Sequence, residues 1–485
     1  MGSVTLFLCT NDCTLLVDKL SIDNKTQVEG DYVMNTIAAK QQKKQKELEK
    51  WRRQLDKKPY RGYSAMLIVM IALVHLLDEY ASSSSGAIQS SIINDLFVNQ
   101  MGMDYTAGLS LMSVVSLLTL IASLAATFYK TLADRYGRRI FFILSALGMG
   151  SGMLICACAE NAFLYFLGRT VIGFFTATDF QVLYAMEVSP PDKRGTFFSV
   201  TKSIGTIGIV LIAVVRGAFI GADGGNWRFV YLIPAIAGIG LAVIALFACR
   251  ETDVFMQRRI ETLERELSGE EAAADSKKEK VGLLPAFRAI IHNRQLLMQM
   301  ISMALFMCAM MPFTGFYESL MTMSGMSTEA VTTALFAYPI SWAALLFISG
   351  FISDKKGRKF TVILFGVLAM VCLGGYIYGA GAGMPPLMVG LLLGGAIGSY
   401  WTSNNSISLM ASEVAPTRLR ASIGSVFGMV SLIASLVATA LFAWLVTFIP
   451  LKPLCLVGGI ATLGLSMLFL VFTTKETAGM ALDAE

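Results

Sequence analysis

Apolar residues form long runs along the chain, separated by short polar segments. Twelve such runs follow one another between residues 64 and 473. A helix of about 20 residues crosses the apolar core of a bilayer, roughly 30 Å thick, so each run predicts a membrane-spanning helix. We therefore expect an all-α integral membrane protein. The expected spans are residues 64–93, 106–130, 139–159, 162–187, 197–220, 229–249, 296–320, 329–352, 360–381, 385–411, 421–448 and 452–473.

A polar segment divides the spans into two sets of six. Residues 250–295 are charged and contain Ser268 and Gly269, so they are too polar to cross a membrane and predict a cytoplasmic linker. The linker separates an N-terminal half, residues 63–249, from a C-terminal half, residues 296–474. A leader of residues 1–62 precedes the first half, and a tail of residues 475–485 follows the second.

The leader contains one strongly charged helical stretch, Lys40–Lys58. It has few apolar positions, so we expect a solvated cytoplasmic helix near the membrane, which anionic lipid headgroups could attract. A dedicated partner for this helix is the weaker alternative. Residues 1–33 match neither a signal peptide nor a myristoylation pattern. One hypothesis is that the natural chain starts at Met34.

Composition supports the membrane class and argues against others. Of the 485 residues, 55% are hydrophobic and 15% charged, whereas soluble domains carry about 25% charged residues. The net charge of +5 requires no nucleic-acid partner, because cytoplasmic loops are basic in membrane proteins. The eight cysteines are scattered, without metal-ligand spacing. Since the sequence has no nucleotide loop, metal cluster or nucleophilic triad, we expect no enzyme, no cofactor and no metal.

The loops differ in positive charge between the two sides of the predicted membrane. One side holds twelve Lys and Arg, and the other holds only Arg228 and Lys452. Because Lys and Arg concentrate in cytoplasmic loops, we expect both termini and the linker in the cytoplasm. The twelve are Lys130, Arg135, Arg138, Arg139, Lys193, Arg194, Lys355, Lys356, Arg358, Lys359, Arg418 and Arg420.

Three short motifs occur twice, once in each half. The block Lys130–Arg139 (KTLADRYGRR) matches Gly350–Lys359 (GFISDKKGRK). In the same order, Glu187–Arg194 matches Glu413–Arg420, and the triplet ending at Thr252 (RET) matches the triplet ending at Thr477 (KET). Matches of this length and order indicate a duplicated domain rather than a solenoid.

The doubled block resembles the loop signature of the major facilitator superfamily, Gly-x-Leu-Ala-Asp-Arg-x-Gly-Arg-Lys, although Lys130 replaces its first glycine. The Arg169–Gly195 run, the Thr314-Gly315 region and the Lys475–Gly479 segment look like its sugar-porter and metabolite:proton-symporter branch. The resemblance covers about residues 64–482. It implies twelve transmembrane helices in two pseudo-symmetric six-helix halves, with a solute site between the halves at mid-membrane.

The resemblance also implies a role for the repeated loops. A carboxylate at a helix end can cap a neighbouring helix or pair with an arginine. In this family such loops form a charge latch that holds the cytoplasmic side shut. Basic topology without any switch is the alternative. The residues implied for this cytoplasmic gate are Asp134, Arg138, Glu187, Arg194, Asp354, Arg358, Glu413 and Arg420.

Ionisable residues inside spans are costly and therefore mark function. His75, Asp78 and Glu79 share one face of the first span, and such close groups titrate together. In proton-coupled relatives an acid of helix 1 pairs with an arginine of helix 4, which implies Asp78 or Glu79 with Arg169. Asp179, ten residues after Arg169, joins this proton-coupling set. The alternative is a buried pair, neutralised by Arg169, without a transport role.

A second group of polar and aromatic residues predicts the solute site. It includes an aromatic and amide cluster in the tenth span, which glycines allow to approach its neighbours or to bend. The predicted substrate-binding residues are Arg169, Gln181, Arg216, Phe313, Tyr317, Glu318, Tyr400, Trp401, Asn404 and Asn405.

The leading functional hypothesis is a secondary active transporter that works by alternating access. We expect proton-coupled symport of a small organic solute, with an organic acid first. A sugar or polyol porter, a drug:proton antiporter and, as a weaker case, a transporter-like receptor are the alternatives. The expected partners are the solute, protons and the lipid bilayer, with no nucleic acid, in a monomer of the cell membrane. The sequence leaves substrate identity and transport direction open.

Overall fold

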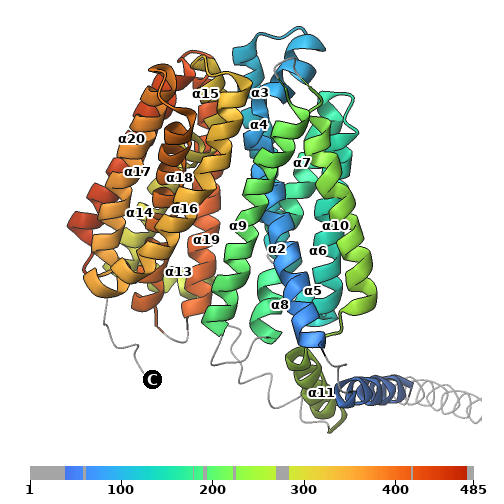
Figure 1. The fold of residues 1–485 in the computed structure, drawn as a ribbon. Coiled ribbons are helices and arrows are strands. Elements are labelled where there is room, and N and C mark those ends of the chain that lie inside the picture. Colours follow the sequence, from blue (N-terminus) through green and yellow to red (C-terminus); the bar gives the residue numbers. More distant parts are fainter. Residues whose placement is uncertain are drawn as a thin grey trace, which may run out of the picture. The chain divides into compact units, whose positions relative to one another are not determined.

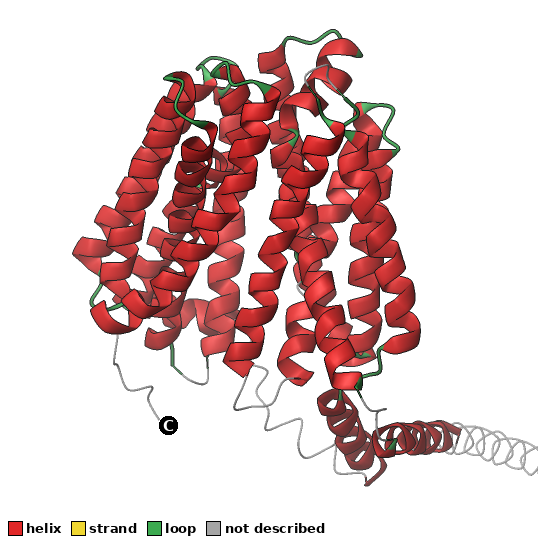
Figure 2. Ribbon diagram, in the orientation of Figure 1, coloured by secondary structure: helices red, strands yellow, loops and turns green. Residues whose placement is uncertain are grey.

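The computed structural model describes residues 39–57, 62–130, 132–178, 180–188, 194–221, 225–268, 283–416 and 419–477. These residues are helical apart from short connections, and they contain no strand (Figure 2). The chain divides into two compact units. The smaller unit combines residues 1–60 with 253–279, and the larger combines residues 61–252 with 280–485.

The larger unit contains both predicted halves (Figure 1). In the N-terminal half, three consecutive segments form the first span and two form the fourth. The helices are α2 (Tyr63–Ala87), α3 (Gln89–Ile92), η1 (Ile93–Asn99), α4 (Tyr105–Lys130), α5 (Leu132–Tyr136), α6 (Arg138–Ala157), α7 (Ala162–Thr176), α8 (Phe180–Val188), α9 (Arg194–Phe219) and α10 (Arg228–Ala248).

The C-terminal half repeats this order, and its first span is again made of three segments. Helix α13 (Leu283–His292) precedes it. The helices that follow are α14 (Arg294–Cys308), η3 (Met311–Gly315), α15 (Tyr317–Met323), α16 (Thr328–Lys356), α17 (Arg358–Gly381), α18 (Pro386–Val414), α19 (Arg420–Leu445) and α20 (Leu451–Thr473).

Helices correspond to all twelve predicted spans, which confirms the predicted fold class. Within the described residues, nine helical segments are long and apolar enough to cross a membrane. The other three spans depart from that pattern for visible reasons. The fourth is split between α7 and α8, the fifth has described side chains only over Ile204–Phe219 of α9, and α18 carries buried polar residues such as Ser399 and Asn404.

The first span of each half is interrupted at the same place. Ile88 follows α2 with φ −131° and ψ 23°, and Phe316 follows η3 with φ −132° and ψ 24°. A π-helical segment lies near each break: η1 follows the first after the short α3, and η3 ends directly before the second. Each span was predicted as one continuous helix. Local departures from helical hydrogen bonding of this kind often lie at functional sites.

The repeated loops share a backbone conformation as well as a sequence. Gly137 has φ 106° and ψ 161°, and Gly357 has φ 101° and ψ 161°. This region of φ and ψ is open almost only to glycine, so the glycine of the repeated motif allows the sharp turn into α6 and into α17. The duplication therefore extends to backbone geometry.

Close glycine contacts bring α16 and α18 together. A Cβ added to Gly394 would lie 1.9 Å from the carbonyl oxygen of Tyr338, and one added to Gly390 would lie 2.2 Å from that of Ala334. These glycines recur at helical spacing, so one face of α18 can rest directly on the backbone of α16. This contact positions Tyr338 and its neighbours at the centre of the unit.

Candidate functional site

A cavity of about 490 Å³ lies between the two halves. Segments α2, α3, α4 and α7 of the first half and η3, α15, α16 and α18 of the second contribute its wall. The wall is mixed, with hydroxyl groups, aromatic rings, thioethers and one charged group of each sign. Its polar and aromatic members are Glu79, Ser82, Ser83, Ser85, Gln89, Ser116, Thr119, Arg169, Thr314, Tyr317, Tyr338, Trp342, Trp401 and Asn405.

Both helix breaks open onto this cavity. Ser85, Gly86 and Gln89 line it from the break at Ile88, and Gly315 and Tyr317 line it from the break at Phe316. Interrupted helices at the interface of two repeats expose backbone polar groups to a ligand, as in many secondary transporters. The two helix breaks can therefore supply backbone hydrogen-bonding groups to a ligand in the cavity.

Arg169 and Glu79 are the charged residues of the cavity wall. Arg169 is 8% exposed, and its Nη1 donates to the carbonyl oxygen of Ala81 at 3.1 Å. Its buried Nε has no hydrogen-bond partner among the described residues. A buried guanidinium N–H without a partner is costly. Arg169 is therefore suited to donate a hydrogen bond to an anionic or other accepting group in the cavity.

Asp78 and His75 are buried beside the cavity rather than in its wall. The Gln181 side-chain amide donates to Asp78 Oδ2 at 3.1 Å, so Gln181, predicted to bind substrate, contacts a proton-coupling candidate. Among the described residues, Arg169 forms no ion pair with Asp78 or Glu79 in this conformation. Asp179 lies outside the described residues, and the proton-coupling set stays a prediction.

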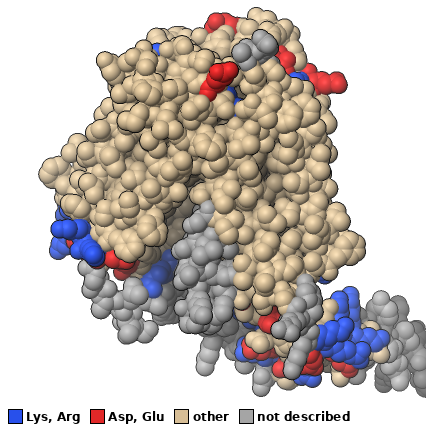
Figure 3. All heavy atoms as spheres, in the orientation of Figure 1, with Lys and Arg blue, Asp and Glu red and all other residues tan. Residues whose placement is uncertain are grey.

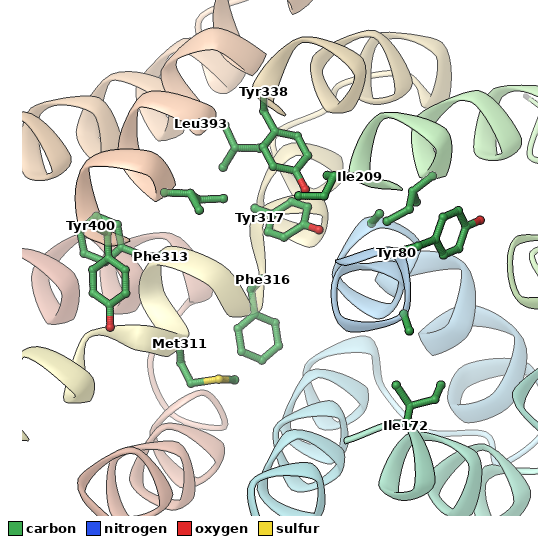
Figure 4. Packing of buried hydrophobic residues seen from close by; sticks show 14 of the residues in the cluster. Tyr80, Ile172, Ile209, Met311, Phe313, Phe316, Tyr317, Tyr338, Leu393 and Tyr400 are labelled. Carbon is green, nitrogen blue, oxygen red and sulfur yellow. The ribbon is translucent and has the colours of Figure 1, made fainter. Parts of the chain in front are cut away.

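The predicted aromatic and amide cluster of α18 is divided between two places. Trp401 and Asn405 line the cavity. Tyr400 packs instead between Phe306 and Phe313, with ring centroids 4.5 Å and 5.0 Å away, and Figure 4 shows Phe313 beside it. Asn404 lines a second cavity of about 620 Å³, which shares Trp401 with the first.

Several cavity residues were not predicted from the sequence. Tyr338 and Trp342 of α16 line it, and Tyr338 lies near Tyr317 with ring centroids 5.8 Å apart. Figure 4 shows Tyr317 and Tyr338 close together beside Ile209 of α9. Their helix looks like an ordinary apolar run, so only the spacing Tyr338 to Trp342, one helical turn, offered a signal in the sequence.

A buried ion pair joins the two halves on one side of the cavity. Arg216 of α9 donates through Nη2 to Glu318 Oε1 of α15 at 3.0 Å, and the two residues are 2% and 0% exposed. The Glu318 carboxylate also accepts from the backbone N–H of Ser90 at 2.7 Å and from its hydroxyl at 2.6 Å. Both residues were predicted to bind substrate, but this network lies outside the cavity wall.

Arg216 adds further contacts to this network, which we call the outer tie (Arg216, Glu318 and Ser90). Its Nε donates to the carbonyl oxygen of Ala87 at 3.0 Å, and its Nη1 donates to Thr328 O at 3.1 Å and to the Thr332 hydroxyl. The outer tie thus connects α2, α3 and α9 of the first half with α15 and α16 of the second. A buried pair so fully hydrogen-bonded is costly to break.

The repeated loops form two matching networks, one in each half. In the first, Arg138 Nε donates to Glu187 Oε1 at 3.0 Å, and the Thr252 hydroxyl donates to Glu187 Oε2 at 2.6 Å. In the second, Arg358 Nε donates to Glu413 Oε1 at 3.1 Å, and the Thr477 hydroxyl donates to Glu413 Oε2 at 2.6 Å. These contacts join helices of the same half.

A glutamate that the sequence marked only as part of a repeat completes each network. The backbone N–H of Arg138 donates to Glu251 Oε1 at 2.8 Å, and that of Arg358 donates to Glu476 Oε1 at 2.8 Å. A carboxylate at a helix N-terminus is favourable. Burial nevertheless raises the pKa of Glu251 above its ordinary value, and hydrogen bonds from the Thr252, Arg138 and Arg139 backbones only partly offset this.

The remaining gate candidates have different surroundings. Asp354 pairs with Arg358, with 2.7 Å between Oδ1 and Nη1. Arg420 Nη2 donates to Ala415 O at 3.5 Å, and Arg420 lines the second cavity. The side chains of Asp134 and Arg194 lie outside the described part of the chain. Whether these loops act as a gate stays a prediction.

Comparisons with known proteins agree with this architecture. Residues 63–439 match the family model of the Major Facilitator Superfamily. The multidrug resistance protein MdtG of Escherichia coli strain 55989 is 32% identical over 160 residues, which are 32% of this chain and 38% of MdtG. The chain thus matches well under half the length of this relative.

Solved structures share the fold at low sequence identity. The D-xylose–proton symporter is 16% identical, with a TM-score of 0.66 over 87% of this chain and 100% of that chain. A bacterial homolog of the human lysosomal transporter Spinster, inward-facing and unoccupied, is 16% identical, with a TM-score of 0.61 over 86% of this chain and 96% of that chain. With the family match over residues 63–439, the repeated loops and the shared fold show that the chain belongs to the major facilitator superfamily, a family of membrane transporters rather than enzymes.

Proposed function

We propose that this protein moves a small organic solute by proton-coupled symport, and that an organic acid is the first candidate. The observation that carries the proposal is the buried Arg169, which lines a cavity between the two halves and whose Nε has no partner within the described residues. A substrate carboxylate would supply that partner, and hydrogen bonds between charged groups are the stronger ones.

Glu79 is the proton site that this arrangement favours. It lines the same cavity as Arg169, so solvent and solute can reach it. Asp78, which is 6% exposed, receives a hydrogen bond from Gln181 and is enclosed by protein. A carboxylate that shares a cavity with a bound anion gains affinity for a proton, because like charges disfavour ionisation. Binding of the anion and of the proton would therefore support each other.

The outer tie gives the proposal a direction of access. With the basic loops in the cytoplasm, as their charge predicts, the outer tie closes the cavity on the outside. The second cavity adjoins the first at Trp401 and continues to Arg420, at the cytoplasmic start of α19. The conformation described then corresponds to an inward-facing state of a cell-membrane protein with cytoplasmic termini.

Drug:proton antiport is the second candidate. Met303 and Met307 line the second cavity, and Met310, Met311 and Trp342 line the first. Flexible thioethers beside aromatic rings suit apolar ligands of varied shape. The local similarity to MdtG, a protein named for multidrug resistance, fits this reading. A sugar or polyol is the third candidate substrate. The hydroxyl groups of the cavity wall support it, and the D-xylose–proton symporter has a similar fold.

Flux assays in proteoliposomes test the proposal. The protein is reconstituted with an imposed pH gradient and offered labelled organic acids, sugars and cationic drugs. We expect accumulation of an organic acid, abolished by a protonophore. Arg169→Gln should lower the apparent affinity for the acid by about 10- to 100-fold, the value of a charged hydrogen bond.

Arg228→Gln is the matched control, because Arg228 pairs with Asp95 at 2.8 Å and lies outside the cavity wall. It should leave the affinity unchanged. Accumulation of a cationic drug against the same gradient would favour antiport. Transport of any solute with equal affinity in wild type and Arg169→Gln would exclude the proposed role of Arg169.

A further inference from the structure

The leader helix, residues 39–56, packs against α11 (Asp253–Ser268) within the smaller unit. The Trp51 and Phe255 rings lie 5.8 Å apart, and Leu48 and Leu263 are buried. Ion pairs join Glu47 to Arg259 and Lys44 to Glu266, each at 2.9 Å. The leader helix is therefore not solvated on all sides, because α11 covers one face.

The covered face leaves a row of cations on another face. Positions 44, 47, 48, 51 and 55 are wholly or partly buried. Lys43, Lys46, Lys50 and Arg53 are all exposed, and at 3.6 residues per turn they fall within about 80° of one another around the helix. We call these four residues the basic stripe. Figure 3 shows Lys and Arg side chains gathered on this part of the chain.

Acidic residues neutralise the basic stripe only weakly. Arg53 lies 3.7 Å from Glu49, but the two side chains are 81% and 58% exposed. Exposed pairs of this kind contribute little. The better-shielded acids of the unit, Glu47 and Glu266, form ion pairs with Arg259 and Lys44, which are not in the stripe. Glu47 also attracts Lys50 of the stripe, but this Coulomb interaction is smaller than the one with Arg259. The stripe therefore keeps its positive charge for an external partner.

Two short covalent connections tether the smaller unit to the larger one. Five backbone steps separate Lys57 from Gly62, next to the first span, and such a segment reaches at most about 18 Å. The other attachment point is equally short, because α11 starts directly after Thr252. Tyr63 and Arg250, beside the two attachment points, lie in contact, since the Arg250 backbone N–H donates to the Tyr63 hydroxyl at 3.0 Å.

We propose that the basic stripe binds the headgroups of anionic lipids in the bilayer that holds the larger unit. Clusters of Lys and Arg immediately next to a transmembrane helix are attracted to anionic headgroups, and each cation adds to this attraction. The attraction acts over about 8 Å at physiological salt. The short connection to the first span allows the stripe to come this close to the headgroups. This inference is independent of the transported solute.

Hydrogen–deuterium exchange of the full-length protein in nanodiscs tests the proposal. Phosphatidylcholine discs are compared with discs containing phosphatidylserine. We expect exchange across residues 43–53 to be slowed about tenfold by phosphatidylserine, and high salt to remove this effect, because the attraction is electrostatic. Lys46→Gln/Lys50→Gln should lose most of the slowing, since glutamine preserves helix propensity and removes only charge.

Arg258→Gln/Arg265→Gln is the matched control, because it removes two exposed cations of the same unit from α11. It should keep the slowing. Equal exchange of the wild type in both kinds of disc would overturn the proposal, and so would equal loss in the two double variants. Slowing by soluble polyphosphate but not by phosphatidylserine would assign the stripe to a soluble polyanion instead. The salt arm uses only the wild type, so it stays informative even if a variant unfolds.

Discussion

Asp78 and Glu79 are neighbours in the sequence with different surroundings in the fold. Asp78 is enclosed and receives a hydrogen bond from Gln181, whereas Glu79 lines the central cavity with Arg169. Adjacent helical residues point about 100° apart, so the rotation of α2 decides which of them meets the solute. The sequence predicted a proton-coupling pair from either acid, and the structure favours Glu79 for contact with the cavity.

Glu79→Gln separates proton coupling from solute movement. We expect the variant to exchange labelled for unlabelled solute across proteoliposomes but to lose accumulation driven by a pH gradient, because the side chain can no longer take up a proton. Counterflow and gradient-driven uptake are the two measurements. Glu329→Gln, at an exposed acid in the first turn of α16, is the control. Retained accumulation in Glu79→Gln would rule out this residue as the proton site.

At the level of elements, glycines decide how closely α16 and α18 pack. Gly394→Ala places a methyl group 1.9 Å from the Tyr338 carbonyl oxygen. We expect the apparent melting temperature to fall by several degrees, because overpacking costs about 1–3 kcal/mol. Thermal unfolding in detergent measures the effect.

Gly424→Ala is the control for this prediction. A Cβ at Gly424 meets nothing within 4 Å, and alanine is the better helix former by about 1 kcal/mol. This variant should keep or slightly raise the melting temperature. If the two variants unfold alike, the glycine contact between α16 and α18 does not control stability.

We expect the pairing of the leader helix with α11 to depend on pH through Glu47. Burial raises the pKa of the Glu47 carboxyl, but hydrogen bonds from Arg259 and Trp51 outweigh it, so the pKa lies below the ordinary 4.5. A lowered pKa in the folded state contributes stability above 4.5, which is lost as pH falls through the folded value. We expect the protection of residues 43–53, taken relative to the intrinsic exchange rate at each pH, to fall below about pH 4.5. Glu47→Gln should flatten this dependence, and Glu49→Gln should not.

At the level of the whole molecule, the outer tie is the described ion pair that crosses between the halves. We expect Glu318→Gln to leave Arg216 buried without its counter-ion, a change that costs about 3–5 kcal/mol when one partner of a buried pair is removed. The equilibrium between the two open states should shift toward the one in which this side is open. A cysteine at Ser85, in a cysteine-free background, should react at least about tenfold faster with an impermeant maleimide added from outside.

Asp95→Asn is the matched control for this shift. It removes the partner of Arg228, but that pair joins η1 to α10 within the first half. Labelling at Ser85 should stay slow. Equal acceleration in both variants would mean that general loosening, rather than the outer tie, controls access.

The sequence by itself predicted twelve spans, because bilayer thickness and helical rise fix the length of an apolar helix that crosses the membrane. The repeated motifs predicted the duplication and the family. Arg169, Glu79 and Trp401, which the sequence singled out because ionisable or amide-flanked residues inside a span need a polar surrounding, line the cavity, and their roles stay predictions. The matching networks at Glu187 and Glu413 follow from repeated motifs in the same way.

Tertiary structure decided which of these residues meet. Arg216 and Glu318 lie in different halves, and their contact depends on how α9 and α15 rotate and dock, which apolar periodicity does not encode. Apolar periodicity likewise does not encode the place of Tyr338 and Trp342 in the cavity wall, or the packing of α11 against the leader helix. Composition and period determine what must be buried in lipid or protein, whereas packing between halves determines what faces the solute.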